Sequence, residues 1–172
     1  YSIVKNIERY LQGFGKKVIK GVNNISSTKG YDLNGKFKVS VKKSRDGYEV
    51  VFKAPDYAAF VDKGVSGNKK TRYYKDYKGA KRKSPFQYKD KAPPSKVFEK
   101  WIKKKGIKGR DKKTGRFITR KSLAFVMAKS MQIKGRDGIG IFQKPLSLEY
   151  KKLNKGIAQA IKKDMKDLLI KK

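Results

Sequence analysis

The stretch that decides the fold runs Ala54-Pro55-Asp56-Tyr57-Ala58-Ala59-Phe60-Val61-Asp62-Lys63-Gly64. Pro55 ends an extended segment, because proline has no N–H for a sheet and fixes its own φ angle. Asp56 is a residue type that caps helices, and Gly64 stands where a left-handed residue ends one. The stretch therefore predicts a corner at which a strand passes into a short turn of helix.

Patterned segments before this corner predict a hairpin and a helix. Apolar and polar residues alternate over 37–42 and again over 48–53, with Arg45-Asp46-Gly47 as a tight turn between them. Further upstream, apolar residues recur every three or four positions from about Ser2 to Asn24, which is typical of an amphipathic helix. Its glycines predict a kink or an early end near Gly15.

After the corner, the residues from Val65 to Ala92 show no clear periodicity and mix aromatic with basic side chains. The aromatic residues are Tyr73, Tyr74, Tyr77, Phe86 and Tyr88, and the basic ones include Lys69, Lys70, Arg72, Lys75, Lys81, Arg82 and Lys83. A structureless segment of this length is usually functional or disordered.

Three interpretations of this segment stay open at the level of sequence. Cations on phosphates and rings under bases would suit a strand of nucleic acid. The same residues would suit an extended arm that anchors its tyrosines on an adjacent subunit. The third interpretation is a solvated, flexible loop. We favour the arm, because the tyrosines are not spaced as a stacking platform.

Helical patterns fill most of the remaining chain. One helix is expected between Ala92–Ser95 and Gly106, and a second after Thr119 or Ser122, with Leu123, Val126, Met127 and Met131 facing inward. A last amphipathic helix is expected from about Asn154 to Ile170.

Composition limits the function classes. The 172 residues suit one domain, and the net charge of +33 favours an anionic or multi-subunit setting. Lysine greatly outnumbers arginine, which suggests general attraction to phosphate more than the reading of bases, although basic residues on a solvated surface would look the same.

Several kinds of chemistry are excluded or disfavoured. The chain has no Cys and no His, so thiol catalysis, Cys/His zinc sites and histidine acid–base chemistry are absent. Acidic residues are few and scattered, so we expect no enzyme, no metal and no cofactor. The longest apolar run, Leu123–Ala128, is too short to cross a bilayer, and no membrane association is expected.

The order of elements resembles the neck and tail-completion proteins of tailed bacteriophages, which join the capsid portal to the tail. The family's typical run of Ala-Pro, Tyr-Ala, an apolar residue, an acid and a Gly is matched in order by Ala54-Pro55, Tyr57-Ala58, Val61, Asp62 and Gly64. Downstream, the resemblance continues through Pro93-Pro94, Trp101-Ile102, Lys105-Gly106-Ile107, Arg120-Lys121-Ser122-Leu123-Ala124, Gly135, Phe142 and Pro145. The heavy lysine content and the long segment after Gly64 depart from the family's pattern.

The resemblance implies an α+β fold in which a small antiparallel sheet packs against an N-terminal helix and C-terminal helices, with a long basic extended loop. It also implies a structural virion protein of the neck or tail, assembled in the host cytoplasm as a six- or twelve-fold ring around the DNA channel. Its partners would be copies of itself, portal or adaptor proteins, tail proteins and, without sequence specificity, packaged DNA.

The residues expected at subunit contacts are Pro55, Tyr57, Ala58, Phe60, Val61 and Gly64 of the corner and the five aromatic residues of the arm, about residues 65–92. The seven basic residues given above for the arm are expected to contact DNA or acidic partners. The alternative is a lysine-rich nucleic-acid-binding protein of ribosomal or DNA-packaging type, which would use the same loop and bind with a steep salt dependence.

Overall fold

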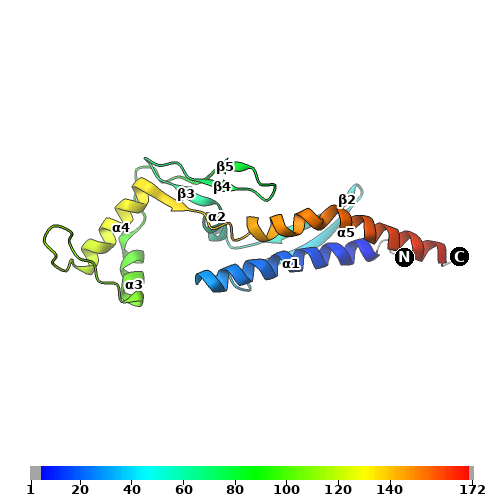
Figure 1. Ribbon diagram of the computed structural model, residues 1–172, viewed down its shortest axis with the longest axis horizontal. Helices are drawn as coiled ribbons and strands as arrows, with labels where there is room; N and C mark the ends of the chain where they lie inside the picture. The colour runs from blue at the N-terminus through cyan, green and yellow to red at the C-terminus, as the bar shows by residue number, and fades with distance from the viewer. Residues whose placement is uncertain (1–4, 171–172) are drawn as a thin grey trace. The chain divides into compact units, whose positions relative to one another are not determined.

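The computed structural model describes residues 5–170 (Figure 1). Within that range the chain forms five helices and six short strands, in the order α1 (Lys5–Lys29), β1 (Lys38–Ser44), β2 (Gly47–Lys53), α2 (Asp56–Lys63), β3 (Gly64–Ser66), β4 (Tyr73–Lys75), β5 (Lys81–Lys83), α3 (Ser95–Lys105), α4 (Arg120–Lys134), β6 (Gly135–Asp137) and α5 (Gln143–Ile170). The expected α+β class is confirmed.

Close contacts divide the chain into two compact units. Unit 1 contains residues 5–62, 75–81 and 139–170, and unit 2 contains Lys63–Tyr74 and Arg82–Gly138. The expectation of a single domain over residues 1–172 stays a prediction.

Unit 1 is built on α1 and α5, which lie side by side and antiparallel (Figure 1). The inward face of α1 carries the expected apolar stripe, with Leu11, Phe14, Val18 and Val22 buried. Glycine brings the helices close, since a Cβ on Gly21 would lie 2.7 Å from the Cβ of Pro145.

The helix α1 is continuous through its glycines and ends at Lys29, so the expected kink or early end near Gly15 is wrong. Its expected start at Ser2 lies outside the described residues. Gly15 is buried against Val39 of β1, where an added Cβ would overlap a valine methyl group. A glycine that looks like a helix breaker in sequence is therefore the point at which the hairpin packs on α1.

The β1–β2 hairpin forms as expected. Its strands pair antiparallel from Lys38 opposite Lys53 to Ser44 opposite Gly47, which leaves Arg45 and Asp46 as the two-residue turn. Below the hairpin lies the core of unit 1, in which Val22, Leu33, Phe37, Ala58 and Ile141 are buried. The Phe142 ring stacks on Phe37 at 5.9 Å between centroids and meets the Phe52 ring edge-on at 5.1 Å.

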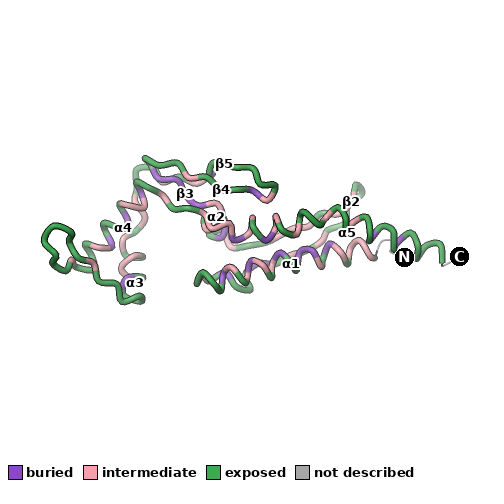
Figure 2. The backbone as a smooth tube through the Cα atoms, in the orientation of Figure 1, coloured by how far each residue is buried: buried purple, intermediate pink, exposed green. Residues whose placement is uncertain are grey.

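Unit 2 has a small core. Among its described residues the buried apolar side chains are Val65, Ile102, Ala124 and Ala128, two of them alanines, and Ser66, Ser84 and Gln132 are buried polar residues. The helices α3 and α4 pack against each other, and β3 pairs antiparallel with β6. Figure 2 shows that the α3–α4 region carries mostly exposed and intermediate residues.

The C-terminal end of α3 and the N-terminal start of α4 are formed by the residues expected there. Gly106 adopts a left-handed conformation (φ 63°) after α3, and the Thr119 side chain accepts a hydrogen bond from the Ser122 N–H at the start of α4. No helix within residues 5–170 combines the length and the apolar character that a membrane crossing needs.

The segment expected to be an extended arm contains three short strands that return to their own chain. Ser66 donates its N–H to Phe86 O and accepts at its carbonyl from Tyr88 N–H, both at 2.8 Å. At the tip between β4 and β5, the Asp76 carboxylate accepts from the N–H groups of Lys78 (3.0 Å) and Ala80 (2.9 Å). The segment is therefore held by hydrogen bonds along much of its length.

Candidate functional site

Asp62, in the corner stretch, holds the start of α5. Its Oδ1 accepts hydrogen bonds from the backbone N–H groups of Phe142 (2.8 Å) and Gln143 (3.1 Å), and its Oδ2 accepts from the Gln143 side chain (3.2 Å). First-turn N–H groups lack partners inside their helix, and the helix dipole favours a negative charge there. The acid of the corner motif is thus a buried cap for a helix that begins far along the chain.

The corner residues expected at subunit contacts divide into two groups. Ala58 and Gly64 are buried, and Val61 packs against the core of unit 1. Pro55 is half-buried, whereas Tyr57 and Phe60 are exposed, and the Tyr57 hydroxyl donates to the carbonyl of Asp32. Their role in subunit contacts stays a prediction, and Tyr57 and Phe60 are the side chains of this set that reach the surface.

Most of the aromatic residues in 65–92 pack on their own unit. Tyr77 meets Tyr150 edge-on at 5.0 Å, and Tyr74 lies under the Lys63 ammonium at 5.7 Å. Phe86 and Tyr88 are half-buried, and Tyr73 is 52% exposed. Tyr77 belongs to unit 1 and the other four aromatic residues to unit 2, and their role in subunit contacts stays a prediction.

The basic residues of the same segment are more accessible. Lys69, Lys70, Lys75, Lys81, Arg82 and Lys83 are all exposed. Arg72 is half-buried; its guanidinium pairs with Asp137 at 2.8 Å and its Nε donates to Lys134 O at 2.8 Å. Arg72 thus stabilises unit 2, and the other six present positive charge to solvent.

An apolar surface lies on α3 and α4 in unit 2, and the sequence interpretation missed part of it. On α4, Phe125 is 59% and Val126 is 57% exposed, and Trp101 of α3 is 44% exposed. We call the exposed apolar side chains of the two helices the α3–α4 surface; they are Val97, Trp101, Phe125, Val126 and Ile133. The expectation that Val126 faces inward is wrong, because the residues of α4 that are buried are Ala124, Ala128 and Gln132.

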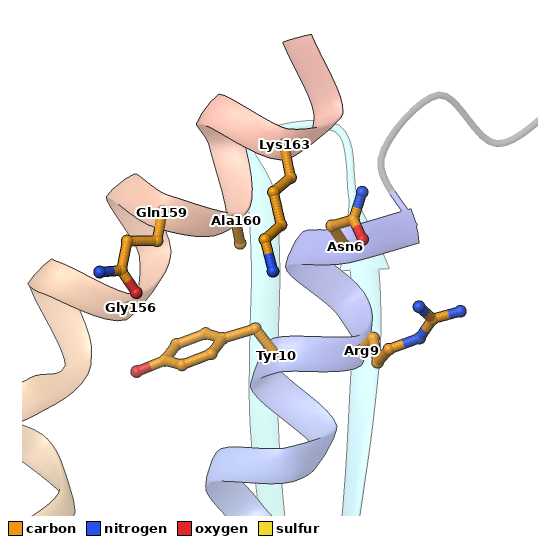
Figure 3. Close-up of a pocket in the computed structure, with 7 residues that line it drawn as sticks. All are labelled: Asn6, Arg9, Tyr10, Gly156, Gln159, Ala160 and Lys163. Atoms are coloured by element: carbon orange, nitrogen blue, oxygen red, sulfur yellow. The ribbon is translucent and has the colours of Figure 1, made fainter. Parts of the chain in front are cut away.

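A groove of about 220 Å³ lies between α1 and α5 in unit 1 (Figure 3). It is lined by Asn6, Arg9, Tyr10, Gly156, Gln159, Ala160 and Lys163. Figure 3 shows Lys163 reaching from α5 toward α1, while Arg9 extends from the outer side of α1. We call this feature the α1–α5 groove. Sequence reasoning missed it because it exists only once the two helices pair.

Contacts at the α1–α5 groove fix its shape. The Tyr10 ring fills the space that a Gly156 side chain would occupy, and its hydroxyl donates to Lys152 O at 3.3 Å. Burial, and secondarily the charge of Glu149, raises the pKa of Tyr10, so the phenol stays a neutral donor.

At one end of the groove a carboxylate caps α1. Asp164 Oδ1 accepts from Asn6 N (3.0 Å) and Nδ2 (2.9 Å), and Oδ2 accepts from Ile7 N (3.2 Å). Burial alone raises the pKa of Asp164, but these hydrogen bonds to the charged form outweigh burial and the pKa is lowered. The Asn6 Nδ2 also donates to Asp167 at 2.9 Å. The acidic groups here are therefore engaged by the start of α1.

Within residues 5–170 no group of three or more Asp and Glu side chains is arranged to hold a metal ion. One acidic residue that is engaged by the backbone instead is Asp111, which accepts hydrogen bonds from the N–H groups of Thr114 and Lys113 in a basic turn; these bonds lower the pKa of Asp111.

Comparison with protein-family models, with curated proteins and with solved structures finds no match to this chain.

Proposed function

We propose that this protein is a structural assembly protein of a tailed bacteriophage. In this proposal it closes into a ring of six or twelve copies in the head–tail connector, around the DNA channel and next to portal, adaptor or tail proteins. The resemblance of the corner motif and of the downstream residues to neck and tail-completion proteins supplies this setting. The single structural observation that supports it best is the α3–α4 surface.

Large apolar side chains are exposed on α3 and α4 of a chain whose net charge is +33. Unit 2 buries two alanines, a valine and an isoleucine among its described apolar residues, yet it exposes Trp101, Phe125 and Val126. On α4, Phe125 and Val126 are consecutive and both exposed, and exposed apolar side chains that cluster on a protein surface usually mark an interaction site. When a contact of this kind joins different surfaces of successive copies and the rotation closes, a ring results.

Charge predicts how assembly depends on salt. Copies with a net charge of +33 repel one another, and salt screens this repulsion over a Debye length of about 10 Å at 0.1 M. Screening by salt does not weaken apolar contacts between copies. Ring formation should therefore become stronger as salt is added, which is the opposite of what phosphate binding does.

Mass photometry across a salt series tests the proposal. We expect a discrete species near six or twelve copies that grows with salt, and its loss in the variant Phe125→Gln/Val126→Gln. The control is Leu148→Gln, which removes an equally exposed apolar side chain from α5 (63% exposed). A wild-type protein that stays monomeric at every salt concentration, or a control that dissociates as readily as the double variant, would refute the role of the α3–α4 surface.

The second candidate is a nucleic-acid-binding protein that uses residues 65–92. It is favoured by the six exposed basic side chains of that segment. A monomer whose duplex affinity falls steeply with salt, and falls further in Lys69→Gln/Lys70→Gln, would support this candidate.

A further inference from the structure

The geometry points to the α1–α5 groove as a binding site for the phosphate backbone of duplex DNA. This inference does not rest on ring formation or on residues 65–92. It rests on the basic side chains that α1 and α5 place along the α1–α5 groove.

On α1, basic residues follow one ridge beside the groove. Arg9 lines the groove. Lys5 lies four residues before Arg9, and Lys16 and Lys20 lie seven and eleven residues after it. At 100° per residue these spacings return to nearly the same side of a helix. All four are exposed, and from Lys5 to Lys20 the ridge spans about 22 Å at 1.5 Å per residue.

On α5, a second row of basic residues lies along the α1–α5 groove. Lys163 lines the groove, and Lys152 lies eleven residues before it, on nearly the same face. Both are exposed, with the neutral Gln159 between them on the groove wall. Lys163 reaches across the groove, whereas Arg9 extends from the outer side of α1, so the two rows of cations lie at the rims of the groove (Figure 3). Such rows suit a linear polyanion, because each phosphate that is neutralised releases counterions.

Polar groups at the Asn6 end of the groove are neutral or already engaged. Asn6 and Gln159 present amides, and the carboxylates of Asp164 and Asp167 accept hydrogen bonds from Asn6. A phosphate between Asn6 and Lys163 would therefore meet cations and amides, whereas a phosphate nearer Lys152 would also meet the charge of Glu149, which, secondarily to burial, raises the pKa of Tyr10.

The aromatic content of the groove favours a duplex over a single strand. Proteins that bind single strands stack bases on aromatic rings. Of the groove-lining residues the aromatic one is Tyr10, and its ring is packed against Gly156. Lysine dominates the two rows, and lysine acts as a point charge without the planar fork that reads guanine. Binding should accordingly be independent of sequence.

The test compares variants that remove equal charge from different places, with a 20-base-pair duplex as the probe. Two lost phosphate contacts should lower the slope of log affinity against log salt by about 1.8, and the affinity roughly 30-fold at 0.15 M salt. We expect this loss for Arg9→Gln/Lys163→Gln. The control Lys38→Gln/Lys53→Gln neutralises two exposed lysines opposite each other on the β1–β2 hairpin and should change affinity less than twofold.

Three results would overturn the inference. The first is an equal loss of affinity in the groove variant and the hairpin control. The second is no loss of affinity in the groove variant. The third is tighter binding of a single strand of the same length, with the same dependence on the groove residues.

A folding defect could imitate the expected loss of affinity, so a variant that keeps both charges serves as a control: Arg9→Lys/Lys163→Arg should retain wild-type affinity. Lys16→Gln/Lys20→Gln, on the same ridge, should weaken binding as the groove variant does. Since ring assembly strengthens with salt and duplex binding weakens, failure of one proposal is distinguishable from failure of the other.

Discussion

Replacing Gly15 by alanine tests how closely the hairpin is packed on α1. An added Cβ would overlap the Val39 Cγ2 and lie 3.2 Å from both Cβ and Cγ1 of that residue. Carbon atoms prefer about 3.5–4.0 Å, and valine has little rotamer freedom, so β1 must shift. Overpacking of this kind costs about 1–3 kcal/mol, against about 1 kcal/mol that alanine gains over glycine inside a helix.

Gly13 provides a matched control two residues away. A Cβ there would have no neighbour within 4 Å, so Gly13→Ala should keep the helix gain and stabilise the protein by about 0.5–1 kcal/mol. Gly15→Ala should be less stable than Gly13→Ala by about 1–3 kcal/mol, the cost of overpacking. For a chain of this size, 1 kcal/mol corresponds to about 2–4 °C in Tm.

Urea unfolding followed by circular dichroism measures both variants, with free energies of unfolding compared at a common slope. The double variant Gly15→Ala/Val39→Ala should cost less than the sum of the single changes, because removing the valine methyl groups relieves the overlap. If Gly15→Ala stabilises the protein as much as Gly13→Ala does, the close packing of β1 on α1 is refuted.

Two further predictions concern the buried carboxylates. Asp62→Ala leaves the Phe142 and Gln143 N–H groups without their partner and should lower the free energy of unfolding by about 0.5–2 kcal/mol; unchanged stability in urea would show that water replaces this cap. The lowered pKa of Asp164 means that its stabilising contribution is complete above its ordinary value of 3.8 and is lost as pH falls through the folded-state pKa. Wild-type Tm should therefore fall more steeply than that of Asp164→Asn below about pH 4, and parallel curves would contradict the assignment.

Local patterns predicted the elements that depend on neighbouring residues. The hairpin followed from the alternation of apolar and polar residues around Arg45-Asp46-Gly47, and α3 ended at Gly106 because a left-handed glycine closes it. The expected start of the last helix, near Asn154, is too late, because α5 already begins before Pro145. A proline in the first turn of a helix costs no internal hydrogen bond, so α5 begins at Gln143.

Features that depend on distant partners were not predictable from local patterns. Asp62 caps a helix 80 residues further along the chain, and no local signal marks such a pair. Strands of three residues, such as β4 and β5, are too short to display a period, so the segment after Gly64 was interpreted as an extended arm. The buried residues of α4 are Ala124, Ala128 and Gln132, whereas Phe125 and Val126 are exposed, which reverses the usual inference from residue size.

The pairing of α1 with α5 has a consequence for synthesis on the ribosome. Asn6 and Asp164 stand 158 positions apart, so α1 emerges long before the helix that covers it. Unit 2 lies almost wholly within that interval, and its Arg72–Asp137 pair needs only 65 positions to close. Contacts of short separation form before distant ones. The nascent chain should therefore complete unit 2 before α5 can pair with α1.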